Sequence, residues 1–401
     1  MKTVSEKILS AKSGREARAG DIVVCEADLV LGTDASAPMA IDYFERMGGE
    51  RVRDPSRVLF ALDHYSPPST AKTAAFHDRV RAFAARHGLE VCDVGAGISH
   101  QIAVERGRAA AGDLVIGADS HTVTVGALGA FATGVGSSDL AAAMLTGKVW
   151  LRVPETIRVD VTGDRPDGLT AKDIALALVA QLGADGANYQ ALEFHGEALG
   201  VLPLDDRLVI ANLAVEAGAK AAIFPSAGVT PDAGAHYARV VAIDLSRAGP
   251  VVALPHAPEN VVPLAEAEGT PVQMVFLGTC TGGRAGDFRA ALAVLERGGG
   301  RLASGVRLVV TPASAEVQRE LFEDGTLAKL AALGAVITTP GCGACCGTSG
   351  MIPGDGMSVM STANRNFKAR MGNATASIFL ASPEACAAAA VTGRITDPRD
   401  V

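Results

Sequence analysis

The sequence predicts an α/β protein with mainly parallel sheets and more than one domain. Its 401 residues exceed what one ordinary hydrophobic core accommodates, so two or three domains are expected. Short apolar runs alternate with helical patterns, most clearly in the last third of the chain, which is the order of a parallel sheet. The 45 glycines suit tight turns and loop-built sites.

The last third predicts a βαβαβ series. A helix is expected over 285–297, further helices up to about 333, and a last helix that Ser382 caps and Gly393 ends, with Pro383 at its first position. The strands expected here are 272–277 (VQMVFL), 306–310 (VRLVV), 335–338 (AVIT) and 377–380 (SIFL).

Fewer elements stand out in the earlier part of the chain. Residues 114–117 (LVIG) are expected to form a buried strand. Thr170 and Asp173 form a capping-box pattern, and Gly183 ends the helix that follows. No repeat, low-complexity tract or long linker interrupts the chain, so we expect its domains to be closely joined.

Composition argues against several classes of protein. The net charge of −8 disfavours a nucleic-acid surface. No apolar run approaches the roughly 20 residues of a membrane span, and the N-terminal MKTVSEKILSAKSG lacks the apolar core of a signal peptide. We therefore expect a cytoplasmic protein, in which seven cysteines are more typical of metal ligands or free thiols than of disulfides.

Three cysteines are candidate metal ligands. Cys280 follows one predicted strand, and the C-x-x-C pair Cys342 and Cys345 follows another, so the three should meet at one edge of the sheet. Such a set suits a [4Fe–4S] cluster with one iron left open to polarise a substrate oxygen. A zinc site and a redox pair remain alternatives, although zinc normally needs a fourth ligand that is not at the usual spacing.

The remaining cysteines favour structural roles. Cys346 is adjacent to Cys345, and neighbouring residues rarely bind the same metal, so a free packing thiol is favoured there. Cys25, Cys92 and Cys386 lie in apolar or helical stretches.

Five polar segments are candidates for acid–base chemistry or anion binding. In Asp63-His64 a carboxylate can orient an imidazole, Asn212 and Glu216 share a helical face at i, i+4, and arginine forks match carboxylates. In isolation, each segment is equally typical of a loop, a solvated face or a structural arginine pair. The segments are FALDHYSPP with Asp63 and His64, GAGISHQ with His100, GADSHT with Asp119, Ser120 and His121, ANLAVEAGAK with Asn212 and Glu216, and STANRNFKARMG with Asn364, Arg365 and Arg370.

Taken together and in this order, these segments resemble the aconitase family, in particular the large subunits of two-subunit dehydratases of isopropylmalate and homoaconitate. The resemblance extends from DASAP near residue 34 to GRITDPR at the end. Its collinear stretches are ALDH (61–64), GISHQ (97–101), GADSHTVTVGALGAFATGVGSSD (117–139), TAKDI (170–174), LPHAPENVVPL (254–264), LGTCTGGR (277–284), PGCGACCG (340–347) and STANRNFKARMG (361–372).

The resemblance implies a fold and a set of roles. Three α/β domains, near 1–153, 154–267 and 268–401, would pack around one [4Fe–4S] cluster per subunit, held by Cys280, Cys342 and Cys345. Asp63 and His64 would serve the leaving hydroxyl. The network around the cluster would be His100, Asp119, His121 and Glu216, the carboxylate ligands Arg365 and Arg370, and the lining residues Ser120, Asn212 and Asn364.

The resemblance also implies a reaction and a partner. The reaction would be dehydration and rehydration of a hydroxy-polycarboxylate, with 2-isopropylmalate and 3-isopropylmalate of leucine biosynthesis favoured over homoaconitate, citraconate or dimethylmaleate. A separate small subunit would supply a catalytic serine and another arginine, so this chain alone should be inactive. An RNA-binding regulator without the cluster and a zinc-binding structural protein are competing hypotheses, of which the charge disfavours the first.

Five positions depart from the family pattern. Thr279 and Gly282 stand where a serine and an asparagine flank the first cysteine, Ala344 stands for a proline inside C-x-x-C, and Ala369 for a glycine before the second arginine. Cys346 likewise replaces an aliphatic residue. The ligand positions are kept, but the substrate could be a different malate or maleate derivative.

Overall fold

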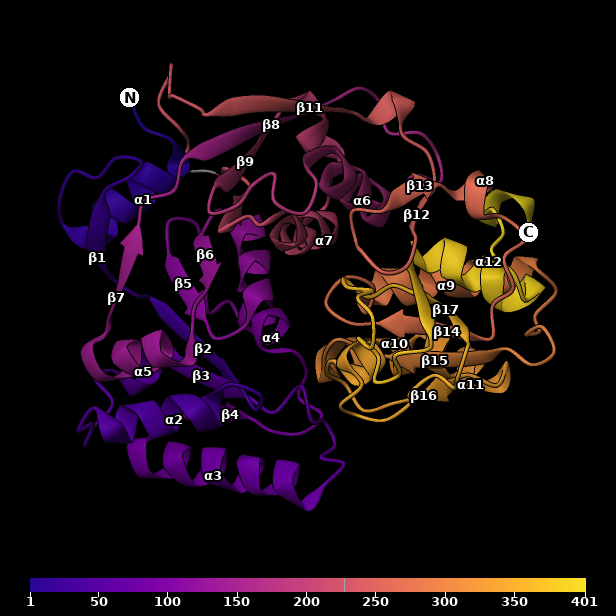
Figure 1. The fold of residues 1–401 in the computed structure, drawn as a ribbon, viewed down its shortest axis with the longest axis horizontal. Coiled ribbons are helices and arrows are strands. Elements are labelled where there is room, and N and C mark those ends of the chain that lie inside the picture. Colours follow the sequence, from indigo (N-terminus) through magenta and orange to yellow (C-terminus); the bar gives the residue numbers. More distant parts are fainter. Residues whose placement is uncertain (227) are drawn as a thin grey trace.

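The first part of the chain forms a five-stranded parallel sheet. The computed structural model describes residues 1–226 and 228–401, and Figure 1 shows this sheet at the lower left, with α2 and α3 beside it. Its strand order is β4-β3-β2-β5-β6. Strands β2, β3 and β5 are buried at every residue because helices cover both faces of a parallel sheet. The strands are β2 (Leu29–Thr33), β3 (Val58–Ala61), β4 (Glu90–Cys92), β5 (Leu114–Gly117) and β6 (Phe131–Gly134); the helices are α1 (Val4–Ser13), α2 (Ala37–Arg46), α3 (Ala71–His87), α4 (Ser99–Glu105) and α5 (Ser137–Thr146).

The strand expected over 114–117 is therefore confirmed as β5. Beside this sheet, β1 (Ile22–Glu26) and β7 (Lys148–Arg152) form a separate antiparallel ribbon. Both strands alternate exposed and buried residues, since only one face of the ribbon packs on the core.

A four-stranded parallel sheet lies along the top of Figure 1, in the order β10-β9-β8-β11. Thr170 caps α6 with Asp173 in a capping box, and Gly183 follows its last residue, as the sequence predicts. The elements are β8 (Thr156–Thr162), α6 (Ala171–Leu182), β9 (Ala191–His195), α7 (Leu204–Leu213), β10 (Ala221–Ile223) and β11 (Arg239–Asp244).

Gly126 allows a segment beside the first sheet to pack closely against the second sheet. The 3₁₀ segment η2 (Ser120–Leu128) packs against β10, and a Cβ at Gly126 would lie 1.9 Å from the carbonyl oxygen of Ala222. Phe224 donates its backbone N–H to the Gly126 carbonyl at 3.0 Å. Only glycine allows this approach, which fixes η2 and the polar residues at its start.

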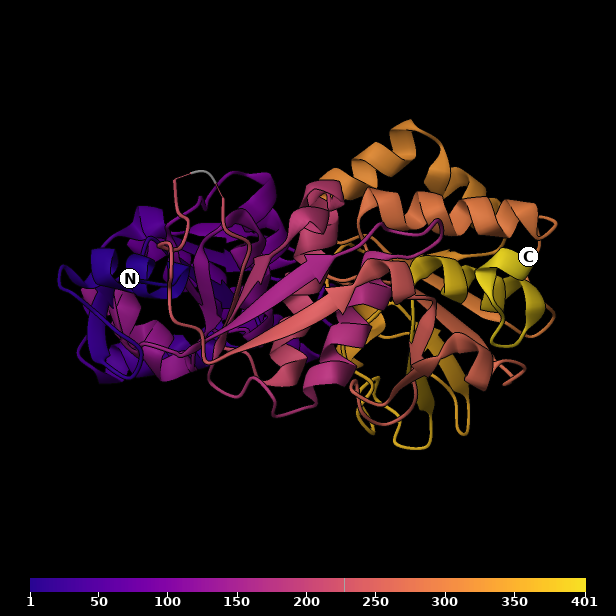
Figure 2. The same ribbon diagram turned by 90° about the horizontal axis from the view of Figure 1, so that it is seen from above.

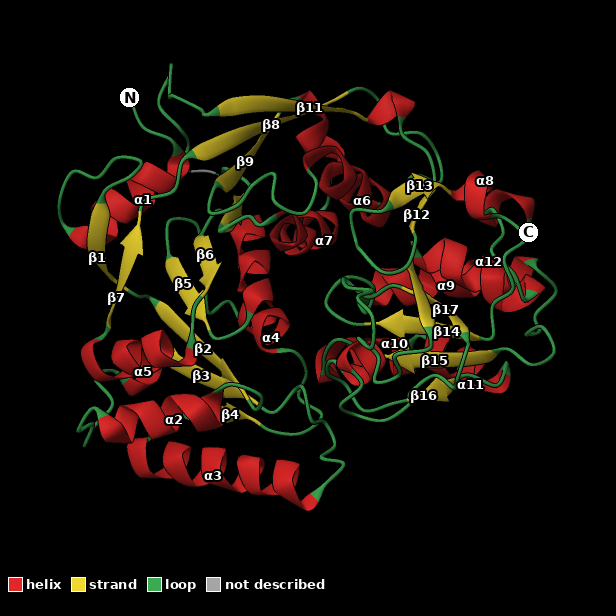
Figure 3. Ribbon diagram, in the orientation of Figure 1, coloured by secondary structure: helices red, strands yellow, loops and turns green. Residues whose placement is uncertain are grey.

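The last part of the chain forms a seven-stranded mixed sheet, in the order β13-β12-β18-β17-β14-β15-β16. Strands β14 to β18 run parallel, whereas β12 pairs antiparallel with β13 and β18. Figure 3 shows helices on both sides of these strands. The elements are β12 (Val251–Ala253), β13 (Val261–Pro263), α8 (Leu264–Ala267), β14 (Met274–Gly278), α9 (Ala285–Arg297), β15 (Arg307–Thr311), α10 (Ala315–Glu323), α11 (Thr326–Ala332), β16 (Val336–Ile337), β17 (Ser358–Ser361), β18 (Ser377–Leu380) and α12 (Pro383–Thr392).

Most predictions for this part are confirmed. Helix α9 has the predicted bounds, β18 occupies 377–380, and Ser382 caps α12 with Pro383 first and Gly393 just after it. Strand β14 begins two residues later than predicted, and β17 was not predicted at all. Strands β12 and β13 precede the predicted boundary at 267/268, so a division by sheets would move that boundary toward residue 251. The three-domain division stays a prediction.

The two halves of the molecule face each other. In the view from above, the N- and C-terminal parts lie at opposite ends, with the four-stranded sheet bridging them (Figure 2). None of the helices in the described residues combines the length and apolar character needed to cross a bilayer.

Candidate active site

Parallel strands of the two large sheets deliver polar residues from their carboxyl ends. In the first sheet, Asp34 follows β2, Asp63 follows β3 and Asp119 follows β5. In the last sheet, Cys280 follows β14 and Cys342 follows β16, as predicted, while Asn364 follows the unpredicted β17. Loops at the carboxyl ends of parallel strands are where α/β folds build their sites.

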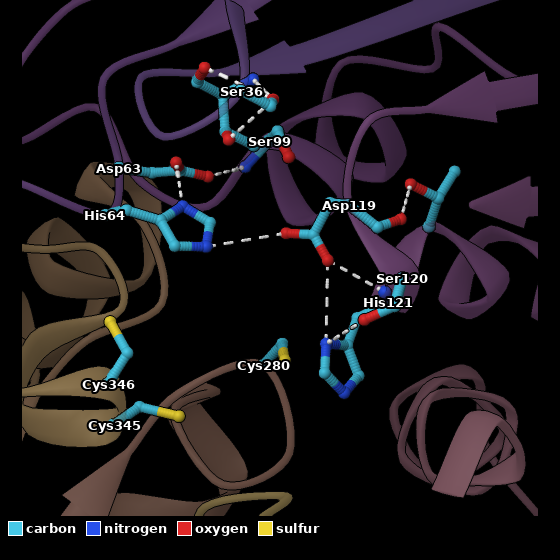
Figure 4. A network of polar contacts seen from close by, with 12 residues as sticks. Ser36, Asp63, His64, Ser99, Asp119, Ser120, His121, Cys280, Cys345 and Cys346 are labelled. Atoms are coloured by element: carbon cyan, nitrogen blue, oxygen red, sulfur yellow. Dashed lines mark hydrogen bonds and ion pairs between the residues drawn. The ribbon is translucent and has the colours of Figure 1, made fainter. Parts of the chain in front are cut away.

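The Asp63–His64 pair is oriented by hydrogen bonds on all sides. Asp63 is fully buried; its Oδ1 lies 2.7 Å from His64 Nδ1, and its Oδ2 accepts the backbone N–H of Ser99 at 2.9 Å. Figure 4 shows the His64 ring directed toward Asp119, whose Oδ2 lies 3.7 Å from His64 Nε2. Burial opposes the charged ring, but the Cys342 sulfur and Asp63 outweigh it, so the pKa of His64 is raised well above its usual value.

A second chain of polar contacts continues from Asp119. Its Oδ1 accepts the backbone N–H of His121 at 2.8 Å, and His121 Nε2 lies 3.0 Å from Glu216 Oε1. Burial would raise the pKa of Asp119, but its hydrogen bond with His121 and the charge of His64 hold it well below its usual value. In Glu216, burial is likewise outweighed by His121 and Arg365, and the pKa is lowered.

Arg365 closes this chain. Its Nε lies 2.8 Å from Glu216 Oε1, and its Nη2 donates to Ser120 Oγ at 3.2 Å. The i, i+4 spacing predicts that Asn212 and Glu216 share one helical face, and this prediction is wrong for a single α-helix. Asn212 is the penultimate residue of α7, and Glu216 lies on the tighter 3₁₀ segment η4 (Ala214–Ala217). Both side chains are nevertheless buried in the site.

The cysteine side of the site receives N–H donors. Asn212 Nδ2 lies 3.0 Å from Cys280 Sγ and Asn364 Nδ2 lies 3.3 Å from it, while Arg370 Nη2 lies 3.6 Å from Cys345 Sγ. Burial, reinforced by Cys345, raises the pKa of the Cys280 thiol to about 12. The Cys345 sulfur in turn raises the pKa of Arg370. Asn212, Asn364 and Arg370 are thus placed to compensate negative sulfur.

His100 contrasts with the other histidines. It begins the buried face of α4 and is 1% exposed, yet neither ring nitrogen has a hydrogen-bond partner among the described residues. Burial lowers the pKa of its ring to about 3, so the ring is neutral. A buried imidazole without partners is costly unless something else binds there.

Similarity to known proteins agrees with this arrangement. The family model described as "Aconitase family (aconitate hydratase)" matches residues 6–230 and 226–393. The chain belongs to the aconitase family. Relatives include 3-isopropylmalate dehydratase large subunit 1 of Methanopyrus kandleri (44% identical; 99% of each chain) and large subunit 2 of Archaeoglobus fulgidus (45%; 100% of this chain, 99% of the relative).

Another relative is the homoaconitase large subunit of Thermus thermophilus, 44% identical over 100% of this chain and 98% of the relative. Among solved structures, the holo-form of Thermococcus kodakaraensis aconitase X shares the fold, with a TM-score of 0.56 at 15% identity over 90% of this chain and 88% of that chain. The aconitase-type α/β fold expected from the sequence is therefore confirmed.

The residues on the cysteine side fit an iron–sulfur cluster. Cys280, Cys342 and Cys345 offer soft sulfur ligands, and burial raises the pKa of Cys280 and Cys342, so a cationic core is the natural compensation for their thiolate forms. In Figure 4 the sulfur of Cys345 points toward Cys280, whereas that of Cys346 points away; Cys346 Sγ lies 2.8 Å from Thr348 Oγ1. The His100 ring, close to Asp119, His121 and His64, adds two buried nitrogens without a hydrogen-bond partner among the described residues.

A mononuclear metal fits less well. Ligand atoms of Asp63, His64 and Cys342 lie within 4.8 Å of one another. Both Asp63 oxygens are already engaged, by the His64 ring and the Ser99 backbone. Asp63 therefore orients His64, and a zinc ion on either oxygen would compete with these hydrogen bonds.

Three residues that support the site were not predicted from the sequence. Lys172 is 2% exposed and donates to Thr281 Oγ1 at 3.0 Å and to the carbonyls of Thr362 and Ala363, tying together the loops of Cys280 and Arg365. The others, Asp34 and His77, lie behind His64. Lys172 and Asp34 lie in the stretches TAKDI and DASAP, which offered a signal, whereas the sequence around His77, which is 1% exposed, offered none.

Two departures from the family pattern carry backbone strain. Thr279 and Ala369 have φ of 73° and 65°, a region that favours glycine. At the third departure, Gly282, the asparagine of the family pattern would not fit, because a Cβ there would lie 2.2 Å from Thr362 Cβ. The strain therefore lies next to Cys280 and Arg370, in the two loops that carry them.

Proposed function

We propose that this chain is the large, cluster-bearing subunit of a hydro-lyase that interconverts 2-isopropylmalate and 3-isopropylmalate by dehydration and rehydration. The observation that carries the proposal is the juxtaposition of a carboxylate-oriented histidine, His64, with the edge that carries the three thiols, since ligand atoms of His64 and Cys342 lie within 4.8 Å of each other. The names of the relatives at 44–45% identity support the substrate, and the cytoplasm is the proposed location.

Cys280, Cys342 and Cys345 would hold one [4Fe–4S] cluster. When bound, such a cluster supplies a Lewis-acidic iron that polarises a substrate oxygen. Asn212 and Asn364 direct N–H groups at Cys280, and Arg370 directs one at Cys345, so this chain stabilises the thiolate form of its own ligands.

His64 is placed to act as the general acid. Asp63 accepts from Nδ1, which leaves Nε2 directed into the site, and the raised pKa keeps the ring protonated near neutral pH. His64 therefore delivers the proton that a departing hydroxyl needs. In rehydration the same nitrogen takes a proton from the incoming water.

The remaining side chains bind and orient. Arg365, held by Glu216 and Ser120, and Arg370 present cationic forks to substrate carboxylates. Asp119 lies beside His64 and His121 beside Glu216, and the neutral ring of His100 lies near Asp119 and His121.

A small subunit would complete the site. The relatives are named as large subunits, and the family resemblance assigns a serine that removes the carbon-bound proton, and a further arginine, to the partner. The purified chain is then expected to hold the cluster but to lack turnover until the partner is added.

Homoaconitate is the second candidate substrate. The Thermus thermophilus homoaconitase subunit is as similar to this chain as the isopropylmalate enzymes are. The strained loops at Thr279 and Ala369 are the places where this chain departs from the family pattern around the ligands.

Turnover of defined substrates tests the proposal. The chain is purified anaerobically with its small subunit and given 2-isopropylmalate, homocitrate or citraconate. Isomerisation of 2-isopropylmalate with the highest kcat/KM is expected. Preference for another acid would replace the substrate, and the absence of hydro-lyase activity on every acid, with the cluster present, would refute the function.

A further inference from the structure

Behind the Asp63–His64 pair lies a buried carboxylate that the proposed chemistry does not use. Asp34 follows β2 and is fully buried. Its Oδ1 accepts the backbone N–H of His64 at 2.9 Å, and its Oδ2 accepts that of Tyr65 at 2.9 Å. Asp34 Oδ1 also lies 3.8 Å from His64 Nδ1.

The same carboxylate is held from the opposite side by a histidine. His77 Nε2 on α3 lies 2.9 Å from Asp34 Oδ2, and the two side chains are 1% and 0% exposed. Burial, reinforced by the nearby Asp63 carboxylate, raises the pKa of Asp34, so the charged form needs a donor such as His77. The His77 side chain comes from a 17-residue helix, so its backbone is already fixed before it donates to Asp34.

The carbonyl side of the His64 peptide is also fixed. Ser349 Oγ donates to the His64 carbonyl at 2.9 Å, and the backbone N–H of Cys342 donates to the Asp63 carbonyl at 2.9 Å. Asp34 thus holds the N–H groups of a loop whose carbonyls are bound to the cysteine loop. Without Asp34, the N–H groups of His64 and Tyr65 would lose their acceptor, and the loop would be held mainly by its bonds to the cysteine loop. The His64 ring could then turn away from Asp119.

We propose that Asp34 and His77 are positioning residues that fix the direction of the His64 ring. His77 holds the Asp34 carboxylate in place, and Asp34 holds the two peptide N–H groups on which the geometry of His64 depends. The inference rests on the proposed function only for the role of His64 as an acid. Neither residue touches the substrate.

Two histidines of one helix provide the test and its matched control. His77→Phe keeps the ring volume and removes the donor to Asp34. His87→Phe changes the same residue type at the end of the same helix, where the His87 ring packs against Phe83 at 4.3 Å between centroids and does not contact Asp34. His77→Gln restores a donor at a similar reach.

The holo complex with the small subunit is measured for kcat, KM and iron content, and hydrogen exchange is followed in the peptide that contains residues 62–66. His77→Phe should lower kcat about tenfold or more at unchanged KM and iron content, since small misplacements of a catalytic group have effects of this order. Amide exchange at 64 and 65 should accelerate about tenfold. His77→Gln and His87→Phe should resemble the wild type in both readouts.

The outcomes separate this inference from the proposed function. If His77→Phe matches His87→Phe in kcat and exchange, or if His77→Gln restores neither, the positioning role is refuted. If the wild-type complex has no hydro-lyase activity, the proposed function fails, while the exchange of residues 64 and 65 still tests the positioning. Should His77→Phe not fold, Asp34→Asn, which preserves volume but removes the charge, must show the same losses, and wild-type values there would refute the role.

Discussion

The two sides of the site differ in how completely the chain itself satisfies them. On the first-sheet side, the polar groups from Asp63 through His64, Asp119, His121 and Glu216 to Arg365 are linked by contacts of 2.7–3.7 Å. On the cysteine side, burial raises the pKa of the Cys280 and Cys342 thiols, and their only nearby donors in the described part of the chain are a few N–H groups such as those of Asn212 and Asn364 on Cys280. The acid–base side is therefore preformed, whereas the cysteine side depends on a bound group.

The largest expected effect comes from breaking the cysteine side. Cys345→Ser should remove or destabilise the cluster and lower turnover about 10³-fold or more, since a metal centre contributes several kcal/mol to such chemistry. Iron and sulfide analysis together with turnover measures both losses. Cys346→Ser is the matched control, because its sulfur points away from Cys280; full cluster and activity in Cys345→Ser would contradict the ligand assignment.

Next is the arginine that ends the preformed side. Arg365→Lys removes the fork that spans Glu216 and Ser120, and a single ammonium cannot replace both contacts. A loss of about 2–3 kcal/mol in substrate binding, roughly a hundredfold rise in KM, is expected with a smaller change in kcat. Steady-state kinetics measures it. A rise in KM with iron content unchanged separates the two sides; loss of iron would show that they are not independent.

The third prediction concerns pH. Asp63 helps to raise the pKa of His64, so Asp63→Asn should lower that pKa. Because the acid form of His64 is lost as pH rises through its pKa, the alkaline limb of the kcat profile should move to lower pH. A pH–rate profile of the dehydration step checks this. An unmoved or upward-shifted limb would rule out Asp63 as the group that raises the pKa.

The smallest expected effect lies in the N–H donors to sulfur. Asn212→Leu removes one hydrogen bond to Cys280 while keeping a similar volume. Loss of one bond to a charged acceptor is about 1.5–3 kcal/mol, and Asn364 remains as a second donor. We expect the cluster to be lost several-fold faster in air, and the decay of its absorbance measures this loss. A cluster as durable as in the wild type would show that Asn364 suffices.

Much of the fold was predictable because local chemistry decides it. Thr170, Ser382 with Pro383, and Gly393 mark helix ends by capping, and the structure places these helix ends there. Strand β17 was missed because SVMS is short and begins and ends in serine, so no apolar run distinguishes it. Its existence follows from pairing with β14 and β18, which is information that a single segment does not carry.

The site shows the same division. The strand-end argument brought Cys280 and Cys342 to one edge, and that expectation holds in the structure. The spacing of Asn212 and Glu216 could not reveal that the helix tightens into η4 between them. His77 was beyond reach for a similar reason: its partner Asp34 is 43 residues away, and only the packing of α3 brings the two together.

Metal and sulfide content of the anaerobically purified complex, measured alongside its turnover of 2-isopropylmalate, tests the central claim most directly. The account predicts about four irons and four sulfides per chain, as three thiolates and a cubane require, with isomerisation only when the small subunit is present. Zinc without sulfide, or full activity after the cluster has been stripped, would contradict it.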